Sequence, residues 1–266
     1  MTRLRTASLL LALGVAVFPA CRGGGARHDL TLAGSTSIQP FADKWAEVFM
    51  EAHPDYGVNV QGGGSSAGIQ ACKSGACQIG MSSRDLKGDE KDLVEIVVAR
   101  DGLAVIVHPS NPVPGVKIAE VKQIFAGDLR SWKLLGGIDR SITVVTREEG
   151  SGTRGAFQEL VMGKTRIYRG AITQDSNGTV REIVAHDPYA IGFISLGLVN
   201  DKVRALALDG AAPSEAHIAD GSYKLVRPFL FVSRGEPSGQ AREFVDFVLS
   251  EEGQAMIRKE GLLPAR

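Results

Sequence analysis

The chain has 266 residues, and its 30 Lys and Arg residues are balanced by 30 Asp and Glu residues. This zero net charge argues against nucleic acid as a partner, because nucleic-acid binding needs a basic surface. Affinity for an anion must therefore come from a local site rather than from the field of the whole protein. A hydrophobic content of 44% and a charged content of 23% are ordinary for a globular protein and argue against wholesale disorder.

The amino-terminal segment 1–21 has the pattern of a secretory signal peptide. Arg3 and Arg5 are positively charged, residues 7–20 are apolar, and Cys21 follows directly. The apolar run is shorter than the roughly 20 residues that a transmembrane helix needs. The segment around Cys21 resembles a bacterial lipobox, so we predict cleavage before Cys21 and lipidation of its sulfur. Ordinary signal cleavage, with Cys21 incidental, is the alternative.

The segment 22–28 contains three consecutive glycines and is predicted to be a flexible tether between the lipid and the folded part. The signal and the tether together predict an exported protein, periplasmic or on the cell surface, that is held to a membrane by its lipid.

Strands and helices alternate along the rest of the chain. Runs rich in Val and Ile, or alternating in polarity, predict strands over 29–33, 57–61, 78–81, 93–107, 142–146, 190–194 and 225–232. Apolar residues at helical spacing predict helices over 38–49, 67–74, 118–125, 154–162, 179–185 and 241–249, with a further helix to residue 259. This alternation predicts an α/β fold with largely parallel sheets. The number of strands predicts two lobes with a ligand cleft between them.

Three strands lead into loops of Gly, Ser and Thr that open a helix, at 34–37, 62–66 and 147–153. Ligands of open α/β sheets bind outside the carboxyl ends of the strands, where helix amides and hydroxyl groups can hold an oxyanion. Arg84 and Arg147 add forked donors that match a tetrahedral anion. Each loop taken alone has a plainer interpretation, since Ser and Thr are preferred helix N-caps whatever the function.

Several longer motifs carry a family resemblance. They are GSTSIQPFADKW, QGGGSSAGIQA, IGMSSR, KQIFAGDLRSW, TREEGSGTR and NGTVREIVAHDPYAIGFISL, and they cover nearly the whole mature chain. In their order and spacing the chain resembles the periplasmic phosphate-binding proteins of high-affinity phosphate ABC transporters. The resemblance implies a type II periplasmic-binding fold that closes over one inorganic phosphate. It also implies a monomer without catalytic activity or cofactor, whose closed form is recognised by the permease of an importer.

The lobes of this family are discontinuous in sequence. By analogy, lobe one would comprise residues 29–106 and 227–266, and lobe two residues 107–226. The two crossings between the lobes would fall near 107–109 and 226–228, where a proline stands beside a strand in each case.

The resemblance also implies a set of phosphate contacts. These are Thr36 and Ser37 in the first loop, Ser65 in the second, and Arg147, Ser151, Gly152 and Thr153 from lobe two. Glu149 matches an acidic position that pairs with Arg147 and orients it.

One position departs from part of the family. Some members have an aspartate where this chain has Ser83, and that carboxylate accepts the proton of hydrogen phosphate while repelling sulfate. Ser83 is itself expected to contact the ligand, and Arg84, which follows, is expected to add a cationic contact. Asp85 or Glu149 are candidates for the missing acceptor. The sequence therefore predicts an oxyanion site and leaves the choice between phosphate and sulfate open.

Two further interpretations concern cysteine and serine chemistry. Cys72 and Cys77 are five positions apart in an exported chain, where either a small-loop disulfide or two free thiols are compatible with the spacing. No second Cys or His pair stands at metal-ligand spacing beside Cys72 and Cys77, so no metal site is predicted. Residues 64–68 fit G-x-S-x-G, which would make Ser66 the nucleophile of a hydrolase with His186 or His217 and Asp175. The glycines before Ser66 disfavour this alternative.

Overall fold

The computed structural model describes residues 28–265, so the predicted signal peptide, Cys21 and nearly all of the tether lie outside the described residues. The strands are β1 (His28–Gly34), β2 (Tyr56–Gln61), β3 (Ile79–Ser82), β4 (Val94–Val107), β5 (Gly115–Val116), β6 (Thr143–Arg147), β7 (Ile172–Gln174), β8 (Ala190–Ser195), β9 (Arg204–Ala205), β10 (Ala207–Leu208), β11 (Val226–Ser233) and β12 (Leu263–Pro264). The helices are α1 (Gln39–Ala52), α2 (Ser65–Ser74), α3 (Ile118–Ala126), α4 (Gly152–Phe157), α5 (Asn177–His186), α6 (Glu215–Ala219), α7 (Gly239–Leu249) and α8 (Glu251–Lys259), and a π-helix over Gln158–Met162 continues α4. The predicted α/β class is confirmed.

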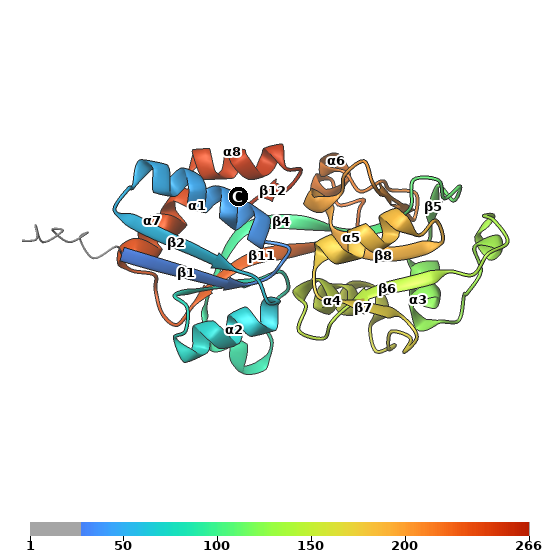
Figure 1. Cartoon of the computed structure of the whole chain (residues 1–266), viewed down its shortest axis with the longest axis horizontal. Coiled ribbons are helices and arrows are strands. Elements are labelled where there is room, and N and C mark those ends of the chain that lie inside the picture. Colours follow the sequence, from blue (N-terminus) through green and yellow to red (C-terminus); the bar gives the residue numbers. More distant parts are fainter. Residues whose placement is uncertain (1–27, 266) are drawn as a thin grey trace, which may run out of the picture.

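The main sheet runs through both halves of the molecule in the order β2-β1-β3-β11-β4-β8-β6-β7 (Figure 1). The outer pairs are parallel, as predicted: β1 with β2 and β3, and β6 with β7 and β8. The central pairs are antiparallel, because β4 leaves the first half and β11 returns to it. The prediction of largely parallel sheets is therefore wrong for the two crossing strands. No helix within residues 28–265 is both long enough and apolar enough to cross a membrane.

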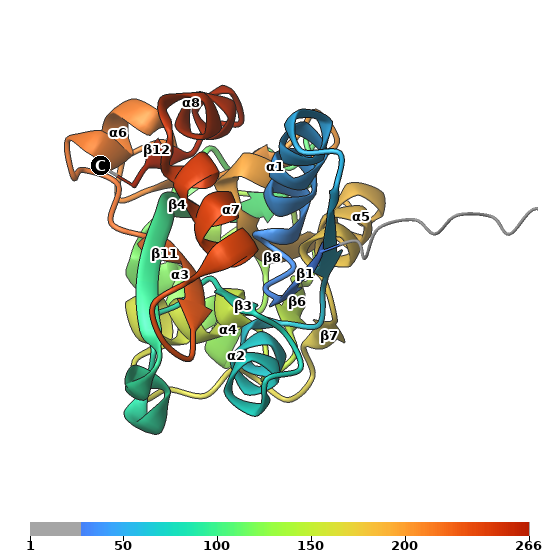
Figure 2. The same cartoon turned by 90° about the vertical axis from the view of Figure 1, so that its left-hand side faces the viewer.

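The first half of the molecule has helices on both faces of its sheet. α1, α7 and α8 pack together on one face and α2 lies on the other (Figure 2). Phe41, Trp45 and Phe49 recur every four residues along α1 and are buried in the core of this half. α2 ends at Gly75, whose left-handed backbone (φ 81°) closes the helix. The buried residues of the cores of this half all lie before residue 100 or after residue 228.

The second half is built in the same way around β8 and β6. Val180 and Val184 of α5 cover one face of these strands, and Phe125 of α3 and Phe157 of α4 cover the other. Phe157 stacks on Phe193 of β8, with the ring centroids 4.0 Å apart and the planes 6° from parallel. The buried residues of these cores all lie between Leu103 and Leu225.

The division of the cores bears on the lobe boundaries. β4 contributes Val98 and Ala99 to the first set of cores, and Leu103 onward to the second. We propose lobe boundaries at Asp101–Gly102 and at Val226–Arg227, so that the first crossing lies earlier than the 107–109 expected from the family.

A buried ion pair lies at this double crossing. Asp101 of β4 stands opposite Arg227 of β11 in the strand register. Asp101 Oδ2 accepts hydrogen bonds from Arg227 Nε at 2.9 Å and Nη2 at 2.8 Å, and the two side chains are 0% and 1% exposed. Ser195 Oγ, at the end of β8, donates to Asp101 Oδ1 at 2.8 Å. Arg227 Nη1 and Nη2 also donate to Ser83 O and Ser37 Oγ, so one ion pair ties the crossing to both lobes.

We expect Asp101→Ala to lower the free energy of unfolding by about 3–5 kcal/mol, because it leaves the buried Arg227 charge without its partner. Urea denaturation measures this loss. Asp139→Ala is the matched control, because Asp139 pairs with Lys133 on the surface (74% and 66% exposed) and should cost under about 1 kcal/mol. Equal losses in the two variants would contradict a special role for the buried pair.

Candidate functional site

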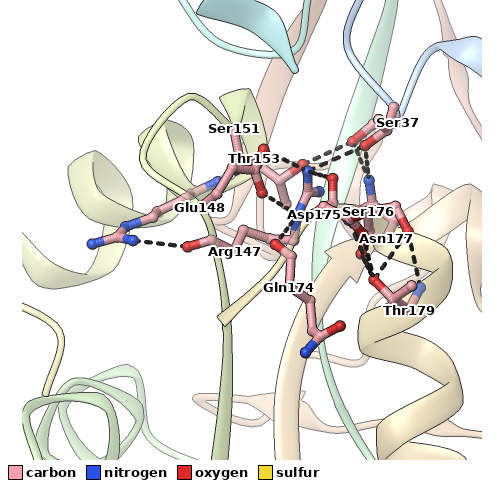
Figure 3. Close-up of polar contacts among 12 residues, drawn as sticks. Ser37, Arg147, Glu148, Ser151, Thr153, Gln174, Asp175, Ser176, Asn177 and Thr179 are labelled. Atoms are coloured by element: carbon pink, nitrogen blue, oxygen red, sulfur yellow. Dashed lines mark hydrogen bonds and ion pairs between the residues drawn. The ribbon is translucent and has the colours of Figure 1, made fainter. Parts of the chain in front are cut away.

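Loops from both lobes meet where the sheet passes from one lobe to the other. Lobe one contributes the turn after β1, the start of α2 and the residue that follows β3. Lobe two contributes the loop between β6 and α4 and the first turn of α5 (Figure 3). The lobes are in direct contact here: Ser37 Oγ lies 2.8 Å from Thr153 Oγ1, and Ser66 N donates to Gly150 O at 3.1 Å. The site residues predicted in the three loops are therefore brought together at one place.

Arg147 is the buried cation of this site. Its side chain is 1% exposed. Nε and Nη2 donate to Glu148 Oε2 and Oε1, both at 3.0 Å, and Nη2 also reaches Thr36 Oγ1 and Asp175 O. Nη1 is buried and has no hydrogen-bond partner within residues 28–265. Burial lowers the pKa of Arg147 from its ordinary value, against the opposite effect of Glu148, but a guanidinium stays protonated in proteins. Arg147 therefore presents an unpaired, charged N–H group.

The carboxylate that holds Arg147 is Glu148, which corrects the prediction that Glu149 does so. The side chain of Glu149 is 91% exposed and lies 3.8 Å from Arg154 Nη2. Consecutive side chains of an extended or turning backbone point in different directions, so only one of two adjacent glutamates can face Arg147. The sequence does not show which one, because the residues after β6 have no regular period.

The hydroxyl group of Ser37 is fixed as a hydrogen-bond donor. Its oxygen accepts from Asn177 Nδ2 at 2.9 Å and from Arg227 Nη2 at 3.1 Å, which occupies both lone pairs. Its proton must then point at Thr153 Oγ1, and Thr153 keeps a hydroxyl proton of its own. Asn177 cannot be flipped, because its Oδ1 accepts the backbone N–H of Ser195 at 3.2 Å.

The neighbouring Thr36 is a donor for the same reason. Its hydroxyl oxygen accepts from Arg147 Nη2 at 3.2 Å and from Asn177 Nδ2 at 3.3 Å. Arg147 Nη2 has two hydrogens and also donates to Glu148 Oε1 and Asp175 O, so its bond to Thr36 is a shared one. The Thr36 hydroxyl group donates to no described residue and keeps its proton for a ligand. Arg147, Asn177 and Arg227 thus set the direction of the hydroxyl groups in the first loop.

The hydroxyl groups of Ser35, Ser83 and Ser65 form a buried chain, the serine chain, that begins in this loop. Ser37 N donates to Ser35 Oγ at 3.2 Å, and Ser35 Oγ donates to Ser83 Oγ at 2.8 Å. Ser83 N donates to Ser65 Oγ at 3.1 Å, and the two hydroxyl oxygens are 3.4 Å apart. One hydrogen bond joins the hydroxyls of Ser65 and Ser83, so one of their two protons is left over for a ligand.

Gly152 allows lobe two to approach this serine chain. A Cβ atom at Gly152 would lie 2.1 Å from Ser65 Oγ and 2.6 Å from Ser83 Oγ, so no larger residue fits while the lobes are in contact. Gly152 and Thr153 are the first residues of α4, and amides at that position have no carbonyl partner within the helix. Ser151 caps α4 by accepting from Arg154 N, which gives it a structural role in the site.

Arg84 is turned away from the serine chain. Its Nη1 and Nη2 donate to Glu90 Oε2 at 2.7 Å and Oε1 at 2.9 Å, and Nη2 also reaches Ser66 Oγ at 3.3 Å. Glu90 lies in a 3-10 turn over Gly88–Asp92, and its carboxylate also accepts Lys87 N. This geometry does not support the predicted contact between Arg84 and the ligand. Arg84 instead holds the segment after β3 in place.

The constellation that the alternative hydrolase interpretation requires is not assembled. Ser66 Oγ accepts from Arg84. His186 Nδ1 is bonded to Glu182 O, His217 Nδ1 to Ala212 O, and Asp175 Oδ1 accepts from Thr179. None of these candidate partners contacts Ser66.

Cys72 and Cys77 are free thiols in the structure, so the disulfide alternative is not present. Both are buried in the small core between α2 and β11. Cys72 Sγ donates to Val232 O at 3.3 Å, and a hydrogen bond from Cys77 lowers the pKa of Cys72 to about 7. No group of three or more His, Cys, Asp or Glu side chains within residues 28–265 is arranged to hold a metal ion.

Asn177, Arg227 and Asp101 were missed by the sequence analysis. Asn177 lies within the NGTVRE motif, and Arg227 lies at the predicted crossing 226–228. The motif could have indicated Asn177, and the crossing could have indicated Arg227. Asp101 gave no signal, because it stands inside a strand of Val and Ile residues.

Comparison with known proteins agrees with this geometry. A family model described as a PBP superfamily domain matches residues 22–252. Phosphate-binding protein PstS of Bacillus subtilis is 39% identical over 245 residues, which cover 90% of the chain and 81% of that protein. The chain belongs to the family of periplasmic phosphate-binding proteins. The predicted resemblance and the two-lobed periplasmic-binding fold are thereby confirmed.

Two solved structures of this family superpose on the chain. One is a protein from Clostridium perfringens, described as a phosphate ABC transporter substrate-binding protein with bound phosphate. It is 40% identical to this chain with a TM-score of 0.87, and the match covers 90% of this chain and 100% of the Clostridium chain. An ABC-type phosphate transport receptor from Vibrio cholerae is 37% identical with a TM-score of 0.74, covering 88% and 99%.

The Arg84–Glu90 pair predicts a pH dependence of stability. Hydrogen bonds from Arg84 lower the pKa of Glu90 below its ordinary value, so the pair stabilises the fold above the unfolded pKa of about 4.3. This contribution is lost as the pH falls through the lowered folded pKa. We therefore expect Glu90→Gln to cost about 1–3 kcal/mol at pH 7 and progressively less below about pH 4.

Urea denaturation of wild type and Glu90→Gln across this pH range measures the difference. Glu159→Gln is the control, because Glu159 is 55% exposed and its ion pair with Lys87 is long, with 3.9 Å between Oε2 and Nζ. A Glu90→Gln deficit that does not change with pH would contradict the assignment.

Proposed function

We propose that this chain is the extracytoplasmic solute-binding protein that captures inorganic phosphate between its lobes and delivers it to an ABC importer. The observation that carries this proposal is the unpaired, buried Nη1 of Arg147 at the contact between the lobes. An unpaired buried donor, especially a charged one, costs several kcal/mol, so the closed form favours an anion that accepts from it.

The groups around Arg147 add to this preference. Thr36, Thr153 and the Ser65–Ser83 pair each keep one hydroxyl proton, and the first amides of α4 face the same contact. Such a set of donors matches a tetrahedral oxyanion. Because the donors come from both lobes, the ligand makes more bonds in the closed form than in the open form and shifts the equilibrium toward closure.

The remaining parts of the proposal follow from the family and the sequence. The protein acts as a monomer and without catalysis, and no group of the site is placed to attack the ligand. Cleavage before Cys21 and lipidation of its sulfur would anchor it, and the tether of residues 22–28 would let the lobes reach a permease. The bacterial PstS proteins to which it is similar are named as phosphate-binding proteins.

We expect calorimetric titration of ligand-free protein to show sub-millimolar phosphate binding that excess sulfate does not disturb. In Arg147→Ala, phosphate affinity should fall by about a hundredfold or more, because a buried charge-assisted contact is lost. Arg140→Ala, which removes an exposed arginine of the same lobe, should bind like wild type.

Equal binding of phosphate and sulfate would keep the oxyanion site and overturn phosphate as its specific ligand. Phosphate binding that survives Arg147→Ala would overturn the site itself.

The two adjacent glutamates provide a sharper test of the geometry. We expect Glu148→Ala to weaken phosphate binding about tenfold, because Arg147 loses the bidentate partner that aims Nη1 at the ligand. The loss of a negative charge works in the opposite direction, but Glu148 is 32% exposed and its long-range effect is screened. Glu149→Ala should stay within about twofold of wild type, since exposed charges contribute little. The reverse ranking, measured by the same titration, would restore the role expected from the family.

A further inference from the structure

A second polar cavity lies in lobe two, behind the loop that carries Arg147. It has a volume of about 570 Å³. Arg154 of α4 and Arg166 and Arg169 of the segment before β7 line it, and Glu149 is the one carboxylate among the lining residues. We call this cavity the arginine pocket. Three guanidinium groups against one carboxylate leave a surplus of positive charge there.

The arginines of the pocket are poorly neutralised by the protein. Neither Arg166 nor Arg169 takes part in an ion pair within residues 28–265. Arg154 lies 3.8 Å from Glu149, which is itself 91% exposed. Like charges gathered in one cavity repel each other, so an anion bound among them stabilises this arrangement.

A buried hydroxyl group lines the same pocket without a partner. Thr146 of β6 is 3% exposed, and its Oγ1 has no hydrogen bond within residues 28–265. Most buried polar groups are paired, because an unpaired one costs about 1–3 kcal/mol. The unpaired hydroxyl group of Thr146 therefore lies at the wall of the cavity that the three arginines line.

The segment that carries Arg166 and Arg169 is held by contacts of the protein itself. Gln158 Nε2 donates to the carbonyl oxygens of Gly163 and Thr165, both at 2.7 Å. Tyr168 N donates to Phe125 O of α3 at 2.8 Å. The guanidinium carbon of Arg130 lies 5.4 Å from the centroid of the Tyr168 ring. The backbone of the pocket is therefore formed before any ligand binds, which lowers the entropic cost of binding.

We propose that the arginine pocket is a second anion site, which binds a compact oligophosphate with two or more linked phosphoryl groups. Its volume is within the range of about 300–1,000 Å³ typical of small-molecule sites, and a single tetrahedral anion would fill only a small part of it. The charge surplus matches a multivalent anion, and arginine is the side chain best suited to phosphoryl oxygens. Arg154 Nη1 also donates to Arg147 O at 2.8 Å, so one loop borders both the cleft and the pocket.

The test is calorimetric titration of the purified protein with inorganic pyrophosphate, with and without saturating phosphate. We expect one equivalent of pyrophosphate to bind while phosphate occupies the cleft. Arg166→Ala/Arg169→Ala should weaken this binding by about tenfold or more, because two charge-assisted contacts are lost. Thr146→Val should weaken it about threefold or more without lowering the melting temperature, because it removes an unpaired hydroxyl at nearly constant volume.

The matched control is Lys133→Ala/Arg140→Ala, which removes the same charge from exposed positions of lobe two. It should bind pyrophosphate like wild type. Complete competition by phosphate, or equal weakening in the control, would overturn the second site. Phosphate titration of Arg166→Ala/Arg169→Ala reports on the cleft separately and should match wild type, so failure of the pocket and failure of the proposed phosphate site are distinguishable.

Discussion

The buried ion pair between Asp101 and Arg227 is the interaction on which the rest of the structure depends. It lies where β4 and β11 pass between the lobes, so it neutralises a charge at the one place where the sheet is common to both. The same guanidinium holds Ser37 Oγ and Ser83 O. The orientation of the ligand-facing hydroxyl groups is therefore coupled to the packing of the crossing strands. A change in the geometry of the crossing also changes the donors of the cleft.

The charge balance between the lobes explains why closure should depend on an anion. Arg227 is neutralised by Asp101, which is completely buried, whereas Arg147 is neutralised by Glu148, which is one-third exposed. One arginine is thus paired in the interior and the other shares its carboxylate with water. The four charges cancel, but Arg147 Nη1 is left buried at the contact without an acceptor among the described residues. An oxyanion between the lobes supplies acceptors for Arg147 Nη1, Thr36 and Thr153.

The sequence predicts the longer strands and the α-helices other than α6 because their apolar residues follow a regular period; the five residues of α6 are too few to show one. It does not predict β5, β7, β9, β10 or β12, since strands of two or three residues are too short to show one. The loops of the site were found by composition, but the roles of individual side chains within them were not. The choice between Glu148 and Glu149 depends on irregular backbone angles. The contacts of Asn177 and Arg227 with Ser37 join positions 140 and 190 residues apart, which no local pattern reveals.

The serine chain gives a physical account of a cleft without the aspartate that some family members have. Ser37 N–H donates to Ser35 Oγ and Ser35 Oγ donates to Ser83 Oγ, whereas in the bond between Ser83 and Ser65 either hydroxyl group can be the donor. When Ser83 donates to Ser65, its Oγ keeps a lone pair that can accept from a ligand; when Ser65 donates to Ser83, the Ser83 proton can go to the ligand. A carboxylate at this position would only accept. A hydroxyl group can therefore accept the proton of hydrogen phosphate or donate to an ionised oxygen by rotating about one bond. Discrimination against sulfate then depends less on repulsion by a fixed charge and more on which rotation leaves fewer buried groups unpaired. Ser37 does not have this freedom, because both of its lone pairs are occupied and its proton points at Thr153 Oγ1.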